Sequence, residues 1–280
     1  MPSNPFTPTF GVTPPLLVGR QDEIDDFRFA LQEGIGAPER MTLLTGMRGT
    51  GKTVLLTAYE DVARSEGWLV ISETAEPGMI DRLTKTAVPG LLAEIDEQHE
   101  PRPDFRYRMN QLLDAIEPED GVLISIDEIR GTEDFELLSH TVQHLRREER
   151  NVAFVGAGLP SSVQTVLSAD RPTTYLRRAD RRHLGMLEAD EVRAALEVPI
   201  LDAGRGIASD ALDIAVEGTR GYPLMVQLVG FETWQASRDD NEITAEHAQQ
   251  GVATAQRRIG ELVHEPALAD LFPATSSSRG

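Results

Sequence analysis

The chain has 280 residues, of which 40% are hydrophobic and 26% are charged, and its formal net charge is -19 at pH 7. This composition supports a hydrophobic core in one large or two medium domains. The absence of cysteine excludes disulfides and thiolate metal sites and agrees with a cytoplasmic location. The strong negative charge disfavours a protein that coats nucleic acid nonspecifically. We also find no secretory signal and no apolar stretch of bilayer length, so we expect no membrane partner.

The first fifteen residues contain five prolines and little periodic pattern. Proline fixes φ and removes a backbone donor, so residues 1–15 predict an extended arm outside the hydrophobic core. The arm is followed by Val18-Gly19-Arg20 and then by Ile24, Phe27 and Leu31, which are spaced to share one face of a helix.

The central motif lies between a strand-like run at 41–45 and a helix-like run at 54–59. Its sequence is Gly46-Met47-Arg48-Gly49-Thr50-Gly51-Lys52-Thr53. Glycines here let successive backbone N–H groups point into one concavity, and the start of the following helix adds a positive dipole end. We expect Lys52 to bind the β- and γ-phosphates and the Thr53 hydroxyl to bind Mg²⁺. This P-loop, in this context, predicts that the protein binds a nucleoside triphosphate.

A second motif follows the apolar run 121–126, which ends in Asp127 and Glu128. The carboxyl end of a buried parallel strand is the edge where ligand sites of α/β proteins form. In a P-loop protein we expect Asp127 to hold Mg²⁺ and Glu128 to polarise the attacking water. The pair favours hydrolysis over phosphoryl transfer to a small acceptor.

The remaining pattern predicts an α/β region followed by helices alone. Further strands are expected at 68–72, 151–155 and 183–187, and helices at 79–99 with a kink at Pro89, 105–116 and 135–150. After residue 188 we expect helices at 189–197, 209–219, 222–236 and 244–263, the first ending near Pro199.

A basic run interrupts the acidic chain and consists of Arg171, Arg177, Arg178, Arg181, Arg182 and His183. Three interpretations stay open. These arginines bind phosphate or bridge subunits, they form a local nucleic-acid patch, or they are solvated and paired with nearby acids.

With these residues, the chain resembles AAA+ ATPases, and more narrowly bacterial Orc1-like ATP-binding proteins and the related STAND ATPases. The similarity spans roughly residues 16–265. Residues 18–23 resemble the adenine-proximal box, 46–53 the Walker A loop, 122–128 the Walker B strand, and Gly221-Tyr222-Pro223 the Gly-x-Pro element of the lid domain. The resemblance implies that ATP is bound by Val18, Gly19, Arg20, the P-loop with Val54, Tyr222 and Pro223.

The same resemblance implies a parallel five-stranded sheet of order 5-1-4-3-2, flanked by helices and followed by a small all-helical lid. We therefore expect an arm at 1–15, an ATPase domain at 16–187, a lid at 188–271 and a polar tail at 272–280. It also implies that an arginine before the last strand, Arg178 or Arg177, reaches a neighbour's γ-phosphate, and that Arg220 is a phosphate sensor on the lid.

Two features depart from the family pattern. Gly156-Ala157-Gly158 offers no counterpart to the polar sensor at the tip of the fourth strand. The usual winged-helix domain does not follow the lid, so DNA binding by that route is not favoured.

The leading prediction is a Mg²⁺-dependent ATPase that acts as a conformational switch, on a partner protein or as a homo-oligomer. One alternative is a nucleotide-gated STAND-like regulatory module with negligible turnover. Another is a DNA-acting accessory ATPase of the transposition or replication type.

Overall fold

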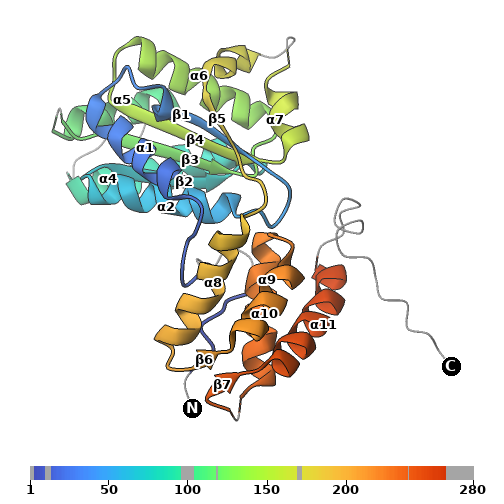
Figure 1. Ribbon diagram of the computed structural model, residues 1–280. Coiled ribbons are helices and arrows are strands. Elements are labelled where there is room, and N and C mark those ends of the chain that lie inside the picture. The colour runs from blue at the N-terminus through green and yellow to red at the C-terminus, as the bar shows by residue number, and fades with distance from the viewer. Residues whose placement is uncertain are drawn as a thin grey trace. The chain divides into compact units, whose positions relative to one another are not determined.

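The computed structural model describes residues 3–9, 14–95, 104–117, 119–168, 172–238 and 240–262. The chain forms two compact units, whose elements are labelled in Figure 1. The sheet unit contains residues 22–47 and 55–184, and the lid unit contains the described parts of 1–21, 48–54 and 185–280. The P-loop residues 48–54 therefore group with the lid and the N-terminal residues.

Five parallel strands form the centre of the sheet unit. They are β1 (Met41–Thr45), β2 (Leu69–Thr74), β3 (Val122–Asp127), β4 (Val152–Gly158) and β5 (Asp180–His183). Their order is β2-β3-β4-β1-β5, which confirms the order expected for a P-loop ATPase of the AAA+ type. Because the strands are parallel, β1, which leads toward the P-loop, and β3, which ends at Asp127, have their carboxyl ends at the same edge of the sheet.

Helices cover both faces of this sheet (Figure 1). On one face, α1 (Gln21–Glu33) and α2 (Lys52–Ser65) pack against Leu44 and Leu123, and the Phe27 and Tyr59 rings stack with centroids 4.2 Å apart. The other face carries α3 (Met79–Arg82), α4 (Val88–Ile95), α5 (Phe105–Ala115), α6 (Glu133–Arg147) and α7 (Pro160–Val166).

The P-loop helix is tied to β3 by a buried polar contact. The Ser125 hydroxyl, in the middle of β3, donates to the Glu60 carboxylate of α2, and both residues are buried. A buried carboxylate needs such partners, because burial without them is costly. The contact fixes α2 against the strand that ends in Asp127.

Two elements of the sheet unit differ from those predicted from the sequence. The last strand spans Asp180–His183, so the expected strand at 183–187 is wrong in position. β5 is an edge strand, where polar side chains are tolerated, and apolar content is a poor guide there.

The helix expected at 79–99 is divided by a π-helical turn at Leu83–Ala87. Pro89 cannot donate to the carbonyl four residues earlier and its ring presses on it, so the helix widens just before the proline. The end of that predicted helix, beyond residue 95, lies outside the described residues.

The lid unit is built mainly from helices, as expected. They are α8 (Ala189–Asp202), α9 (Ser209–Thr219), α10 (Pro223–Ala236) and α11 (Ala245–Leu262). A short parallel pair, β6 (Gly206–Ile207) and β7 (Glu242–Ile243), was not predicted. The predicted end of the first lid helix at Glu197 is wrong, because α8 continues through the buried Pro199. The predicted domain boundary after residue 187 stays a prediction, and the tail lies outside the described residues.

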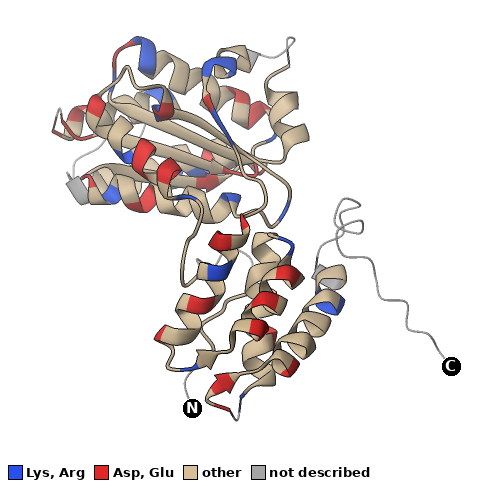
Figure 2. Ribbon diagram, in the orientation of Figure 1, with Lys and Arg blue, Asp and Glu red and all other residues tan. Residues whose placement is uncertain are grey.

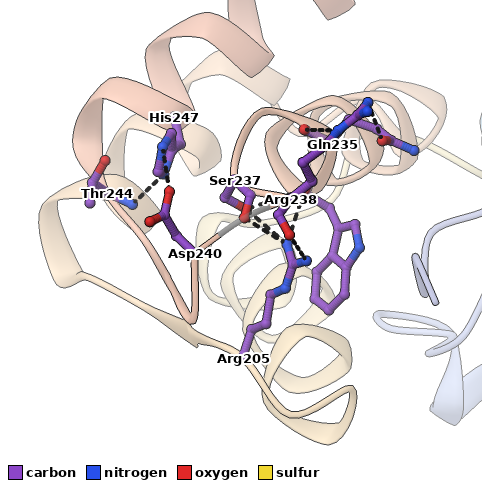
Figure 3. Close-up of polar contacts among 8 residues, drawn as sticks. Arg205, Gln235, Ser237, Arg238, Asp240, Thr244 and His247 are labelled. Atoms are coloured by element: carbon purple, nitrogen blue, oxygen red, sulfur yellow. Dashed lines mark hydrogen bonds and ion pairs between the residues drawn. The ribbon is translucent and has the colours of Figure 1, made fainter. Parts of the chain in front are cut away.

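A buried arginine fixes the carboxyl end of α10 (Figure 3). The Arg205 guanidinium donates to the carbonyl oxygens of Trp234, Ser237 and Arg238 at 2.9–3.2 Å and lies 4.1 Å from the Trp234 ring. These carbonyls have no helical partner and carry the negative end of the dipole, so a cation satisfies them well. Beside it, His247 accepts the Thr244 N–H at 3.2 Å and lies 3.4 Å from the Asp240 carboxylate.

The N-terminal arm differs from the prediction at Phe6. This side chain is 2% exposed and belongs to the hydrophobic core of the lid unit, so the expectation that the whole arm lies outside the core is wrong there. The predicted arm residues 1–2 and 10–13 lie outside the described part of the chain. None of the described helices has the length and apolar character needed to cross a membrane.

Candidate nucleotide-binding site

The lid unit contains a cavity of about 160 Å³. Three segments line it: the N-terminal residues before α1, the P-loop, and the first residues of α8 and α10 with the chain before them. The lining residues are Thr7, Thr9, Pro14, Leu16, Leu17, Val18, Arg20, Gly49, Thr50, Gly51, Lys52, Thr53, Val54, Leu187, Ala195, Pro223, Leu224, Val226 and Gln227. Most of the residues predicted to bind nucleotide therefore surround one cavity.

The P-loop supplies the polar wall of this cavity. Gly51 has a φ of +90°, and, its chain neighbours aside, no atom in the part of the chain that the structure describes lies within 4 Å of the position that a Cβ would take there. α2 begins at the next residue, Lys52, so the positive end of its dipole and its first backbone N–H groups are at the loop. Open space over a helix N-terminus, beside a lysine and a threonine, suits a phosphate group.

The lid element Gly221-Tyr222-Pro223 is bonded to the P-loop backbone. The Tyr222 hydroxyl donates to the Arg48 carbonyl at 2.6 Å, and the Leu224 N–H donates to the Gly49 carbonyl at 3.3 Å. A Cβ at Gly49, whose φ is +72°, would lie 2.2 Å from the Tyr222 hydroxyl oxygen. The lid and the phosphate loop thus fit together only with glycine at position 49.

The segment that is predicted to lie near the adenine is in contact with the start of α8 through Gly19. A Cβ at Gly19 would lie 2.5 Å from the Glu191 carboxylate, which caps α8 by accepting the Glu188 N–H at 2.7 Å. The Arg20 guanidinium donates to the carbonyls of Gly19 at 2.9 Å and Gly185 at 3.3 Å. These contacts place the Val18 and Arg20 side chains in the cavity wall.

Some of the residues predicted to bind nucleotide do not line the cavity. Gly19, Arg48 and Tyr222 support its wall, and Gly46 and Met47 belong to the sheet unit. The sequence analysis did not predict that Thr7 and Thr9 of the arm, or the aliphatic residues Leu16 and Leu17, line the cavity. The lining residues Val226 and Gln227 could have been predicted, because they follow Pro223 by three and four residues and therefore share its helix face.

The acidic motif lies at the carboxyl end of β3 in the sheet unit. The Asp127 carboxylate accepts the Glu128 N–H at 2.7 Å, and the Glu128 carboxylate pairs with Arg130 at 2.7 Å. The Glu128 backbone has a φ of +51°, which is uncommon for a residue with a side chain. Such strained backbone occurs often at functional sites and is consistent with a chemical role for Glu128.

The oxygen atoms available suit Mg²⁺ better than a transition metal. Magnesium favours one or two carboxylate or hydroxyl oxygens and completes its shell with phosphates and water. The side chain of Thr53, in the lid unit, is exposed, and that of Asp127, in the sheet unit, is half-buried. The described residues contain no group of three or more His, Cys, Asp and Glu that would form a self-sufficient metal site.

The tip of β4 has no room for the polar sensor of the family. A Cβ at Gly158 would lie 2.8 Å from the Ile129 side chain, and one at Gly156 would lie 3.2 Å from it. Ile129 is fully buried and its N–H donates to the Ala157 carbonyl at 2.8 Å. An aliphatic side chain therefore fills the place next to these glycines.

Basic and acidic residues are interspersed along the elements of the chain (Figure 2). The arginines of the basic run differ in their side-chain contacts. Arg177 donates to the Leu167 carbonyl at 2.7 Å, and Arg181 donates to the Arg177 carbonyl at 3.2 Å. Arg182 pairs with Asp180 and Asp26. Burial, the largest single effect, lowers the pKa of Arg182, but the hydrogen bonds and negative charges of these carboxylates together raise it above its ordinary value.

Arg178 is exposed and has no hydrogen bond or ion pair with the described residues. Arg171 lies outside them. In the lid unit, Arg220 is exposed at the end of α9 with a φ of +49°, and it does not line the cavity.

Comparison with known families gives one match, which covers half of the chain. Residues 16–155 match the family described as AAA ATPase domain. No curated protein matches the chain.

Several solved structures share its fold. The Walker-type ATPase PABY2304 of Pyrococcus abyssi is 17% identical with a TM-score of 0.63, covering 91% of this chain and 75% of that protein. The ORC2 protein of Aeropyrum pernix, solved in ADPNP and ADP complexes, is 14% identical with a TM-score of 0.61, covering 89% and 70%. The RuvB Holliday junction branch migration motor of Thermotoga maritima is 16% identical with a TM-score of 0.54, covering 85% and 70%.

Proposed function

The chain belongs to the AAA ATPase domain family, and we propose that it is a Mg²⁺-dependent ATPase that works as a conformational switch. The observation that carries the proposal is the contact of the lid with the phosphate loop. The Tyr222 hydroxyl and the Leu224 N–H are both bonded to P-loop carbonyls beside a cavity that the P-loop lines. A phosphate bound by this loop is therefore adjacent to the lid backbone.

We assign each chemical role to a residue whose surroundings support it. Lys52 and the P-loop N–H groups bind the phosphates, and the Thr53 hydroxyl with Asp127 holds Mg²⁺. Bound Mg²⁺ would neutralise charge on the phosphates. Glu128 orients and polarises the attacking water. Arg178 is the candidate for stabilising the γ-phosphate of a neighbouring subunit, because it is the exposed arginine of its run without a partner among the described residues.

The switch follows from a difference in contacts between nucleotide states. A ligand changes a conformational equilibrium only if it binds the two conformations with different free energies. ATP and ADP differ at the γ-phosphate, which lies at the P-loop, and the P-loop carbonyls are bonded to Tyr222 and Leu224 of the lid. Loss of the γ-phosphate then alters lid packing, and a partner protein or a second copy in the cytoplasm reads that change.

A regulatory module with very slow turnover is the second candidate. Two observations favour it: the Glu128 carboxylate is paired with Arg130, and Ile129 fills the place beside the missing sensor. Both reduce hydrolysis without affecting nucleotide binding. DNA is not part of the proposal, because three arginines of the basic run are bonded within the chain and the net charge is -19.

The test of binding uses the two lysines of the chain, Lys52 and Lys85. Lys85 is an exposed helix residue paired with Asp81 at 2.9 Å, so Lys85→Ala is a matched control. We expect Lys52→Ala to abolish ATP binding in calorimetry while Lys85→Ala binds like the wild type. Equal ATP affinity in the two variants would remove the phosphate site from the P-loop.

A further inference from the structure

We propose that the N-terminal segment 4–9 is a strap that retains the base of the bound nucleotide, with Phe6 as the positioning residue that anchors it. The inference rests on the proposed function, because it concerns release from the same cavity. Phe6 does not line the cavity and acts through the residues that follow it.

The anchor is a fit between Phe6 and one glycine of α10. The Phe6 side chain is 2% exposed, and a Cβ at Gly230 would lie 2.5 Å from its ring. Two residues before Phe6, the Asn4 amide donates to the Phe231 carbonyl at 3.1 Å, and the Phe6 N–H donates to the Asn4 side-chain oxygen at 3.1 Å. An aromatic ring in a glycine-lined gap, with polar contacts beside it, fixes the strap on α10.

The strap continues from this anchor into the cavity wall. The Thr7 N–H donates to the Gln227 side-chain oxygen at 3.2 Å, and Thr7, Thr9 and Gln227 all line the cavity. Gln227 is four residues after Pro223, so the bond joins the strap to the helix face that follows the Gly-Tyr-Pro element. Figure 1 shows the dark-blue N-terminal segment running beside α8 and α10.

The strap covers the base rather than the phosphates. The P-loop provides the charged and N–H groups that phosphates need, and the other walls include Leu17, Val18, Leu187 and Val226. Aliphatic side chains suit the flat apolar face of a purine. A base between these walls can leave only if a wall moves, and the strap is a chain segment held by one ring and a few hydrogen bonds.

The experiment releases the strap in two independent ways. Phe6→Ala removes the anchor, and Gly230→Ala places a methyl group where the ring lies without changing the strap. Gly260→Ala in α11 is the matched control, because, apart from its own helix backbone and chain neighbours, no atom of the described residues lies within 4 Å of the added Cβ. The readouts are the dissociation rate of radiolabelled ADP and the affinity for inorganic tripolyphosphate, which lacks a base.

We expect both strap variants to release ADP about tenfold faster, since most affinity changes within one site appear in the dissociation rate. Their affinity for tripolyphosphate should stay within about twofold of the wild type, because the P-loop is untouched. An equal loss for both ligands would show that Phe6 merely stabilises the lid and would overturn the proposal. Unchanged ADP release in folded variants overturns the strap alone, whereas no binding of ADP and tripolyphosphate by the wild type overturns the proposed function as well.

Discussion

The hydroxyl of Tyr222 donates a hydrogen bond to the backbone carbonyl of Arg48 at 2.6 Å. Tyr222 is completely buried, and its ring also lies against Gly49, the glycine in the middle of the P-loop. The lid residue is therefore in contact with the backbone that would wrap the phosphates. The proposed switch therefore requires that a change in the P-loop on phosphate binding reach the lid through this residue.

We predict that Tyr222→Phe weakens ATP binding by about fivefold, since a neutral hydrogen bond contributes about 1 kcal/mol. Isothermal titration of ATP measures the effect. Tyr175→Phe is the control, because the hydroxyl of the half-buried Tyr175 donates to the Ser139 carbonyl at 2.7 Å in the sheet unit. Both variants should lose similar stability, but only Tyr222→Phe should lose affinity.

Gly49→Ala should damage the site more severely than the loss of a hydrogen bond. The added Cβ would lie 2.2 Å from the Tyr222 hydroxyl, and a φ of +72° strains any residue with a side chain. We expect ATP affinity to fall at least about tenfold, which corresponds to about 1.4 kcal/mol. The double variant with Tyr222→Ala should recover part of the loss. Failure of that rescue would mean that backbone strain alone explains the defect.

Glu128→Gly should stabilise the protein and stop turnover. A φ of +51° destabilises a residue with a side chain but not glycine. Urea denaturation should therefore show that the free energy of unfolding rises by about 1 kcal/mol. Glu149→Gly is the matched control, because Glu149 is also a glutamate with positive φ, +56°, and lies outside the motifs. It should gain similar stability and keep full turnover. Turnover in Glu128→Gly at the wild-type rate would exclude Glu128 from catalysis.

Arg178→Ala should reduce hydrolysis about a thousandfold if the arginine acts on a neighbour's γ-phosphate. Arg177→Ala should have little effect, because Arg177 is bonded to the Leu167 carbonyl. Mixing the Arg178→Ala and Glu128→Gln proteins tests directly whether Arg178 acts on the nucleotide of a neighbouring subunit. Each variant supplies what the other lacks, so the mixture should hydrolyse ATP faster than either protein alone. No recovery would show that Arg178 does not act across subunits.

The sequence predicted the sheet and the P-loop well for physical reasons. Buried parallel strands such as β3 are continuous apolar runs, and the glycines, Lys52 and Thr53 have few uses other than phosphate binding. β5 was misplaced because its residues, Asp180 to His183, are polar and its pairing to β1 determines its position. The end of α8 was predicted wrongly because proline usually ends a helix. In the structure α8 continues through Pro199, where tertiary burial outweighs the lost hydrogen bond.

In the candidate site, the N-terminal arm differs most from what the sequence predicted. Nothing local distinguishes Phe6 from other residues of a proline-rich segment, because its partner Gly230 is more than two hundred residues away. The Tyr222 contact with Arg48 is equally nonlocal. The motifs gave the candidates for phosphate binding, which stay predictions, whereas the other walls of the cavity depend on tertiary contacts that residue spacing does not encode.

The most direct test of the central claim is steady-state ATP hydrolysis with Mg²⁺ by wild type and Glu128→Gln, together with ATP binding by both. We predict that both proteins bind ATP, that the wild type releases phosphate, and that Glu128→Gln releases none above background. Equal phosphate release by the two proteins, or ATP binding by neither, would contradict the account.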